Sequence, residues 1–295
     1  MRKAGKIIMR TVWLLVMAVF SLVMLYPFIF SLMAALNTKT EFSNMGDLFP
    51  WPKSPQFGNF AVILTPNGLR PLINTFLRVG WYTVIVCIMA ILVGYVMARY
   101  NFKGKKLFLG IIVGTQVIPG VLTLIPTFVM VANIPLVGGN DIFGNGGQGL
   151  INSPLMLYLP LGWGYLMWVF LFMQSMKSLT PAFEEAAEMD GCGFFRTMFQ
   201  IVLPMQLPII AVIAVNVALN TWNDWMTPFM YINNMQESTL PAYIGMLTAQ
   251  LQQFGTKDYP RVFALSCVAI VPPFLIFLFL QKYIIQGIAS AGVKG

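Results

Sequence analysis

Residues 185–204 read EAAEMDGCGFFRTMFQIVLP, and this stretch decides how the whole chain is interpreted. Its Glu-Ala-Ala is followed after three residues by Gly191 and after nine more by Ile-x-Leu-Pro, which ends at Pro204. Proline suits the first turn of a helix and glycine suits the position just after its end, so Pro181 and Gly191 predict a helix between them. The stretch therefore predicts one helix, a sharp turn at Gly191 and a second helix.

Acidic residues are concentrated just before this turn. Four of the ten acids in the chain lie within seven residues, namely Glu184, Glu185, Glu188 and Asp190. Local helix stability does not need so many. A single acidic turn would be interpreted as the solvated face of an amphipathic helix, and that interpretation stays open until the rest of the pattern is considered.

The composition indicates a membrane environment. Of the 295 residues, 58% are apolar and only 9% are charged, whereas a soluble domain carries about a quarter charged residues. So few charges cannot cover a surface that faces water. The net charge of +8 does not indicate a nucleic-acid partner, because the basic residues flank apolar segments.

Six segments have about the 20 mostly apolar residues that a transmembrane helix needs. They are residues 12–35, 72–98, 108–132, 153–175, 209–232 and 262–281. The first is too long for a signal peptide, and no small-residue cleavage pattern follows it. The sequence therefore predicts an all-α integral membrane protein with one transmembrane domain over residues 1–295.

The distribution of basic residues predicts the orientation of the chain. If the N-terminus is cytoplasmic, 12 of the 18 Lys and Arg residues fall on the cytoplasmic side, and the remaining six, Arg78 among them, fall outside. This asymmetry follows the positive-inside rule, and the densest basic group lies at residues 99–106. Both termini and the loop 176–208 are then cytoplasmic.

The stretch at 185–204 resembles, at every defining position, the EAA signature of permease subunits in ATP-binding-cassette (ABC) importers. Six segments in 295 residues, with this signature between the fourth and the fifth, are similar to the smaller permease of the maltose-type carbohydrate importers. The resemblance covers nearly the whole chain. It implies the type I ABC importer permease fold, a place in the bacterial cytoplasmic (inner) membrane, and import of a sugar or oligosaccharide.

The resemblance also implies roles for the residues of the signature. A coupling helix would dock in a groove of a partner ATPase, where Glu185 would pair with a basic residue. Ala186 and Ala187 would permit close approach, and Gly191 would permit the turn. The predicted coupling residues are Glu184, Glu185, Ala186, Ala187, Glu188, Asp190, Gly191, Ile201, Leu203 and Pro204.

The same resemblance implies roles for two further segments. The C-terminal residues Gly292, Val293, Lys294 and Gly295 are similar to a tail that is common in this group, which implies that they lie at the ATPase interface. The external segment 233–260 occupies the position of a loop that probes the cleft of a sugar-binding protein. We therefore expect binding-protein contacts from Leu240, Tyr243 and Gln250.

Polar residues inside the apolar segments are candidates for a translocation path. They are Gln116, Asn216, Asn220, Asn223 and Asp224. The last four recur at helical spacing along one face of the fifth segment. Gln116 stands just before Pro119-Gly120, an interruption that can mark a broken helix beside a cavity. The same amides could instead hold helices together, and both interpretations stay open.

No catalytic or metal site is predicted. The chain has no histidine, and its three cysteines share no metal-ligand spacing. It also lacks the Gly-x-x-x-x-Gly-Lys-Ser/Thr loop that cradles ATP phosphates. We expect a protein that is not an enzyme and holds no cofactor, with ATP and Mg²⁺ bound by partner subunits.

The expected partners follow from the resemblance. They are a second, homologous permease forming a heterodimer, two ATPase subunits, an extracytoplasmic solute-binding protein, a sugar and the lipid bilayer, but no nucleic acid. The alternatives are an importer permease for a non-sugar solute, an ion-coupled secondary transporter, and a membrane enzyme acting on lipid-linked substrates. A secondary transporter usually needs intramembrane acids or inverted repeats, and neither is evident.

Overall fold

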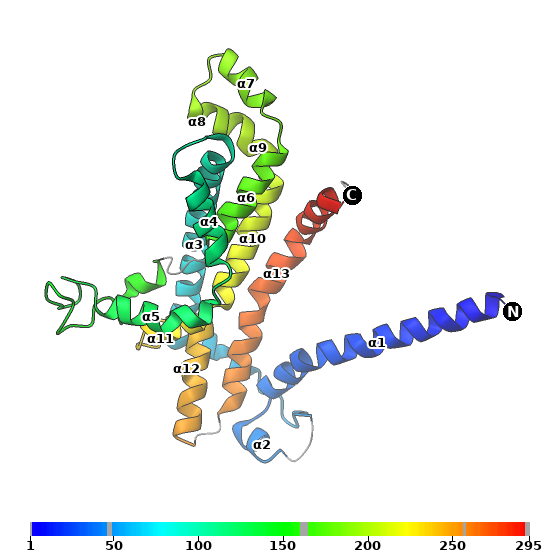
Figure 1. Ribbon diagram of the computed structural model, residues 1–295. Helices are drawn as coiled ribbons and strands as arrows, with labels where there is room; N and C mark the ends of the chain where they lie inside the picture. The colour runs from blue at the N-terminus through cyan, green and yellow to red at the C-terminus, as the bar shows by residue number, and fades with distance from the viewer. Residues whose placement is uncertain (1, 46–48, 160–164, 256–257, 293–295) are drawn as a thin grey trace. The chain divides into compact units, whose positions relative to one another are not determined.

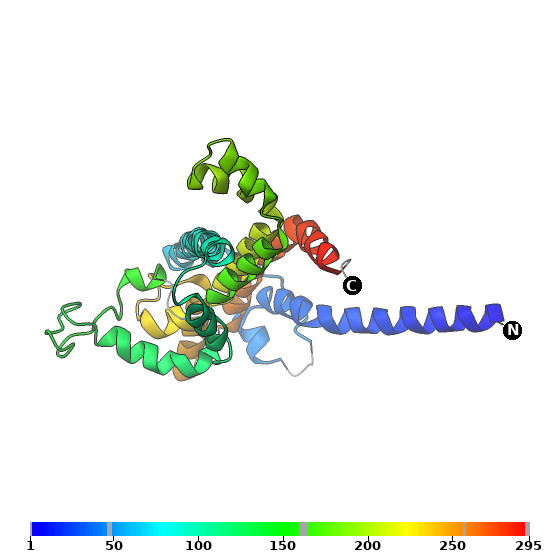
Figure 2. The same ribbon diagram turned by 45° about the horizontal axis from the view of Figure 1, so that its top comes forward.

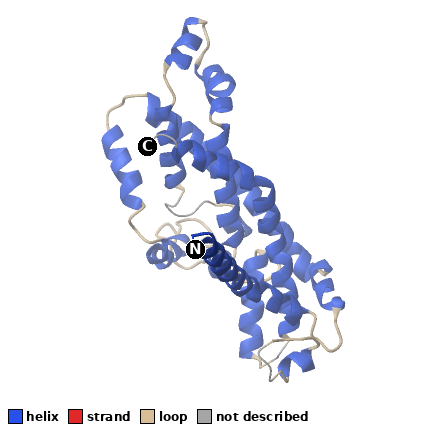
Figure 3. Cartoon of the chain, turned by 90° about the vertical axis from the view of Figure 1, so that its right-hand side faces the viewer, coloured by secondary structure: helices blue, strands red, loops and turns tan. Residues whose placement is uncertain are grey.

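The computed structural model describes residues 2–45, 49–159, 165–255 and 258–292. Every regular element in these ranges is a helix, which confirms the predicted all-α class (Figure 3). The α-helices are labelled in Figure 1. The elements are α1 (Arg2–Ala35), α2 (Lys39–Ser43), η1 (Phe57–Leu64), α3 (Pro66–Arg99), α4 (Lys105–Thr115), α5 (Gly120–Ala132), η2 (Pro154–Leu157), α6 (Leu166–Ser178), α7 (Ala182–Met189), α8 (Phe194–Arg196), η3 (Thr197–Val202), α9 (Leu203–Met205), α10 (Leu207–Asn223), α11 (Met226–Tyr231), α12 (Leu240–Gln253) and α13 (Tyr259–Gly292).

The chain divides into two compact units. The first contains Met1–Arg70 and Tyr243–Pro272, and the second contains Pro71–Ala242 and Pro273–Gly295. Aromatic rings fill the first unit, where Phe263 contacts both Phe30 and Phe42. The candidate coupling and path residues, with the exception of the tail, lie in the part of the second unit that precedes α12.

The loop after α1 is held by side chains that bind the backbone. The amide of Asn37 donates to the carbonyl oxygens of Met33 and Pro50, and Asn59 donates to Ala35 and Asn37. Thr38 and Glu41 form a capping box at the start of α2. A hydrogen bond from the Ser54 hydroxyl and one from the Thr38 N–H hold the pKa of Glu41 below its usual value.

Three helices are long and apolar enough to cross a membrane. These spans are Met9–Ala35, Pro66–Arg99 and Tyr259–Phe279, at the places of the first, second and sixth predicted segments. Two bent pairs bring the number of spans to five if each pair crosses once: α4 with α5, and Phe194–Met205 with α10. The described residues therefore form a multi-pass membrane protein.

The third and fourth predicted segments differ from single helices. Residues 108–132 form α4 and α5, which meet at a bend of 105° beside Pro119. Proline cannot donate the backbone hydrogen bond that would continue the helix, so the chain turns there. Within residues 153–175, the described part forms the short η2 and most of α6, and residues 160–164 lie outside the described residues. The 13 residues of α6 are about 20 Å long, which is less than the hydrocarbon thickness.

The fifth predicted segment, 209–232, is also interrupted. Helix α10 ends at Asn223, and α11 begins at Met226. Pro228 explains the break. It has no backbone N–H to donate to the carbonyl oxygen of Asp224, four residues earlier, and its ring would clash with that oxygen in a continuous helix. The predicted polar face is therefore one continuous helix only as far as Asn223.

The core of the second unit lies where α3, α6 and α10 run side by side (Figures 1 and 2). Buried residues from these helices and from η3 form one cluster: Tyr82, Val86, Ala90, Tyr95, Phe172, Met176, Met198, Val202, Ile213 and Val217. Gly94 permits the close approach of α3 to α6. A Cβ atom at Gly94 would lie 2.9 Å from Phe172 Cδ1 and 3.0 Å from the Val169 carbonyl oxygen.

We predict that Gly94→Ala lowers the stability of the protein. The added methyl group forces α3 and α6 apart, at a cost of about 1–3 kcal/mol. The midpoint of thermal unfolding in mild detergent measures the effect. Gly80→Ala is the matched control, because Gly80 also lies inside α3 and its Cβ would have no neighbour within 4 Å. Equal midpoints for the two variants would contradict this account of the α3–α6 contact.

Candidate functional site

The predicted coupling helix is α7, and it ends in a glycine turn. The backbone N–H of Gly191 donates to the carbonyl oxygen of Glu188 (3.0 Å), and the N–H of Cys192 donates to Ala187 (2.9 Å). This pair of bonds defines a Schellman motif, which needs a left-handed residue at the position of Gly191. Gly191 has φ = 76°. This left-handed conformation explains why α7 ends at a glycine, as predicted.

Glu184 is turned toward the body of the protein. Its carboxylate accepts a hydrogen bond from Arg99 Nε at 2.7 Å and one from the Tyr95 hydroxyl at 3.1 Å. Arg99 also donates from Nη2 to the carbonyl oxygen of Leu179 (3.0 Å). The side chains of Glu184 and Arg99 are only 14% and 13% exposed. This ion pair ties the first turn of α7 to the end of α3.

The remaining acids of α7 face outward. Glu185, Glu188 and Asp190 are exposed, whereas Ala187 is buried. Large apolar side chains are exposed among and just after them, with Met189 at 88% and Phe195 at 66%. Together with the three outward-facing acids, Met189 and Phe195 form a mixed apolar and acidic surface. A protein groove with an apolar floor and a basic rim would be complementary to this surface.

The second half of the signature leads back into the bundle. After α8, the chain makes a π-helical turn, η3, and Pro204 lies in the short α9. A bend of 80° follows, and α10 begins at Leu207. The buried Gln206 stands at the bend and accepts a hydrogen bond from the Ser175 hydroxyl of α6 (2.6 Å). Ile201 and Leu203 are half-buried, so they attach the loop to the bundle.

The candidate path residues occupy different environments. Asn216 is half-buried and donates to the carbonyl oxygen of Val212 in its own helix (2.8 Å). Asn220 and Asn223 are exposed on the last turns of α10. Gln116 is exposed at the bend between α4 and α5, where its amide donates to the Ile112 carbonyl oxygen (3.4 Å). Of the candidate path residues on α10, Asn220 and Asn223 are therefore the two whose polar side chains are exposed.

Asp224 forms an ion pair that the sequence analysis missed. Arg78 Nη2 lies 2.5 Å from Asp224 Oδ2, and Nη1 donates to the Asp224 carbonyl oxygen (3.3 Å). The second oxygen, Oδ1, accepts the N–H of Thr227 (3.1 Å). Arg78 also lies over the Tyr82 ring, 5.0 Å from its centre. Pro228 has no backbone N–H to donate to the Asp224 carbonyl oxygen, and Arg78 donates to this oxygen instead.

Arg78 was counted among the basic residues of the external side, within the predicted segment 72–98. It lies inside α3, and its side chain is 2% exposed. Apolar neighbours on α3 gave no signal that the arginine is buried. The signal that could have found the pair is the presence of one acid, Asp224, in an otherwise uncharged segment, because a carboxylate there needs a partner.

The residues expected to contact a binding protein lie in or at the start of α12. Leu240 and Tyr243 are buried, and Gln250 is exposed. The backbone N–H of Leu240 donates to the Thr75 hydroxyl (2.8 Å), so Leu240 anchors the start of α12. Of the three residues, only Gln250 is open to a partner.

The predicted tail lies at the end of α13. This helix ends at Gly292, and Val293, Lys294 and Gly295 lie outside the described residues. The described part of the chain contains no group of three His, Cys, Asp or Glu side chains that could hold a metal ion.

Comparison with known proteins identifies the class to which this fold and loop belong. Residues 89–290 match the family described as binding-protein-dependent transport system inner membrane component. The chain belongs to this family, and it is therefore a membrane component of a transport system. The predicted resemblance to importer permeases is confirmed.

Particular relatives cover nearly the whole chain. The chain is 29% identical over 290 residues to the arabinooligosaccharides transport system permease protein AraQ of Halalkalibacterium halodurans, covering 96% of each. It is 28% identical to the melibiose/raffinose/stachyose import permease protein MelC of Bacillus subtilis, covering 100% of each. A solved structure of a bacterial ABC transporter involved in the import of the acidic polysaccharide alginate matches with a TM-score of 0.74 and 19% identity, over 95% of this chain and 97% of that one. The fold is that of type I ABC importer permeases.

We predict that Gly191→Ala weakens the turn after α7. A left-handed backbone costs a residue with a Cβ atom about 1–2 kcal/mol, while the methyl group itself meets nothing within 4 Å. Faster hydrogen exchange of the Cys192 amide would report the loss. Gly193→Ala is the control, since Gly193 also has open space but an ordinary φ of −76°. Unchanged exchange in Gly191→Ala would show that the turn does not depend on glycine.

We predict that Asp224→Asn destabilises the protein by about 3 kcal/mol, because it leaves the buried Arg78 guanidinium without its countercharge. The double variant Arg78→Met/Asp224→Asn should cost less than the sum of the single variants in thermal unfolding. Asp258→Asn is the control, since its partner Arg261, at 3.3 Å, is 60% exposed and the pair contributes less than about 1 kcal/mol. Additive single effects would mean that Arg78 and Asp224 do not stabilise each other.

Proposed function

We propose that this chain is one of two pore-forming permease subunits of an ATP-driven importer for a sugar or oligosaccharide. The observation that carries the proposal is the exposed surface of α7, with Glu185 outward and Glu184 bonded to Arg99. The family match supports a transport role. The substrate class is supported by relatives whose names specify arabinooligosaccharides and the sugars melibiose, raffinose and stachyose.

The division of the four acids supports the coupling role of α7. Glu184 holds the helix in place, so Glu185, Glu188 and Asp190 are free for a partner. In the proposed mechanism, α7 docks in a groove of an ATPase subunit, and Glu185 pairs with a basic residue there. Closure of two ATPases, which bind ATP and Mg²⁺, then moves α7 and the helices attached to it through η3 and α10. Ala186, Ile201, Leu203 and Pro204 belong to the same coupling segment.

In the proposed orientation, the chain has six spans and both termini in the cytoplasm, and each remaining partner is assigned to one side of the membrane. A homologous permease completes the pore as a heterodimer, and Asn220 and Asn223 face the path of the sugar. An extracytoplasmic solute-binding protein contacts α12 through Gln250. A second solved structure, described as an alginate ABC transporter in complex with a periplasmic protein bound to alginate pentasaccharide, supports a partner of this kind (TM-score 0.62, 18% identity, 93% of this chain and 94% of that one).

At about 1.5 Å per residue, α13 is about 51 Å long, which supports a tail, Gly292 to Gly295, that extends beyond the membrane to the ATPases.

We predict that Glu185→Lys abolishes sugar uptake and uncouples ATP hydrolysis from it, while membrane insertion is unchanged. Reversal of the charge places like charges together at the docking groove, which costs several kcal/mol. Uptake and ATPase activity are measured on the co-purified complex in proteoliposomes, with a sugar-loaded binding protein. Glu41→Lys is the control, because it makes the same charge change in the loop after α1, outside both the coupling segment and the external segment 233–260.

Two outcomes would overturn the proposal. Wild-type uptake by Glu185→Lys would remove the coupling role of α7. A tagged chain that purifies without a second permease and an ATPase, and that moves solute down an ion gradient, would instead support a secondary transporter.

A further inference from the structure

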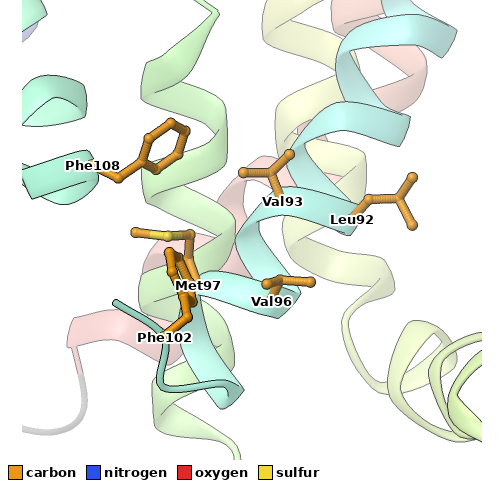
Figure 4. A pocket seen from close by; sticks show the side chains of 6 residues that line it. All are labelled: Leu92, Val93, Val96, Met97, Phe102 and Phe108. Carbon is orange, nitrogen blue, oxygen red and sulfur yellow. The ribbon is translucent and has the colours of Figure 1, made fainter. Parts of the chain in front are cut away.

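An apolar groove lies between α3 and α4, near the end of α3 (Figure 4). Its volume is about 320 Å³, which is within the range of small-molecule sites. Every lining side chain is apolar: Leu92, Val93, Val96 and Met97 from α3, Phe102 from the connecting turn, and Phe108 from α4. Phe102 and Phe108 are 44% and 41% exposed, so the groove is open at its side.

The turn that closes one end of this groove is basic and well defined. It runs from Tyr100 to Lys105, and Gly104 has φ = 90°. The amine of Lys105 donates to the Tyr100 carbonyl oxygen (2.8 Å), which holds the turn together. Lys103 and Lys106 are exposed, and neither forms an ion pair with any residue that the structure describes.

Both charges lie in the short segment that joins the two phenylalanines of the groove, within reach of its open side for a long, flexible lysine side chain. Lys103 directly follows Phe102, and Lys106 stands two residues before Phe108, so both lysines belong to the segment that joins the two lining phenylalanines. Helix α4 begins at this segment, and its first N–H groups add a positive partial charge there. An uncharged groove that opens beside two unpaired cations matches a molecule with an apolar chain and an anionic head.

We propose that this groove binds an anionic phospholipid, with one acyl chain between α3 and α4 and the phosphate between Lys103 and Lys106. Basic pockets beside transmembrane helices recognise anionic headgroups in this way. The positive-inside rule alone explains basic residues near a membrane, but it does not explain an apolar groove that ends at them. Bound lipid fixes the α3–α4 connection next to Arg99, which holds Glu184.

The test measures lipid binding to the full-length chain by native mass spectrometry in mild detergent. The probes are phosphatidylglycerol and phosphatidylcholine with identical acyl chains, and soluble glycerol phosphate is the competitor. We expect one phosphatidylglycerol bound in preference to phosphatidylcholine, with no displacement by glycerol phosphate. Lys103→Ala/Lys106→Ala should weaken binding by about 25-fold, since each basic side chain contributes about fivefold.

A second variant tests the groove without changing charge. Val96→Trp fills the groove from its exposed edge and should weaken phosphatidylglycerol binding although both lysines remain. Val84→Trp is the matched control, because Val84 is 55% exposed on the same helix and does not line the groove. Lys39→Ala/Lys53→Ala, in the loop after α1, is the control for loss of two exposed charges.

Three results would overturn the proposal. Equal binding of the two lipids would exclude headgroup recognition. Weaker binding in the lysine variant but not in Val96→Trp would indicate adsorption of lipid to a charged loop without a groove site. If Val96→Trp released a co-purifying protein subunit and retained the lipid, the groove would be a subunit interface. None of these results affects the proposed transport function, because binding is measured without uptake.

Discussion

The helices of this protein break where lipid offers no hydrogen bonds, so each break must be satisfied from within the chain. Helix α3 supplies most of the donors. Arg78 binds the Asp224 carbonyl oxygen after α10, Arg99 binds that of Leu179 after α6, and Trp81 and Tyr82 bind those of Tyr158 and Leu159 before α6. One uninterrupted helix thereby stabilises the ends of several broken ones. The carbonyl oxygens at these helix ends are therefore paired although the helices do not continue.

This arrangement separates the rigid part of the second unit from the part that is available to partners. The buried core joins α3, α6 and α10, and Gly94 brings α3 against α6. Helix α7 is attached through the Glu184–Arg99 pair, the buried Ala187 and its packing on η3, while its acidic face stays exposed. A docking helix needs this combination, since it must keep its orientation while its outer face stays free.

Much of the fold could be predicted from the sequence, because hydropathy and composition report the solvent around each segment. The helical class, the three long spans and the turn at Gly191 follow from local residue properties. The partners at helix breaks were harder to predict, since the Asp224 carbonyl oxygen beside the break at Pro228 accepts from Arg78, 146 positions away in sequence. The division of the four acids could not be predicted either. Nothing in the sequence distinguishes Glu184, which pairs inward, from Glu185, which is exposed.

The two arginines of α3 connect the functional regions. Arg78 and Arg99 are 21 positions apart in one helix, a separation of about 32 Å, which matches the thickness of the hydrocarbon core. Each of these arginines has little solvent and is stabilised by a carboxylate partner, Asp224 for the buried Arg78 and Glu184 for the mostly buried Arg99. The Asp224 partner adjoins the exposed Asn220 and Asn223, and the Glu184 partner begins α7. In the proposed orientation, the coupling segment and the outer end of α10 are thus held by opposite ends of the same helix. Any movement of α7 that strains the Glu184–Arg99 pair acts on a rigid element whose other end contacts the candidate path.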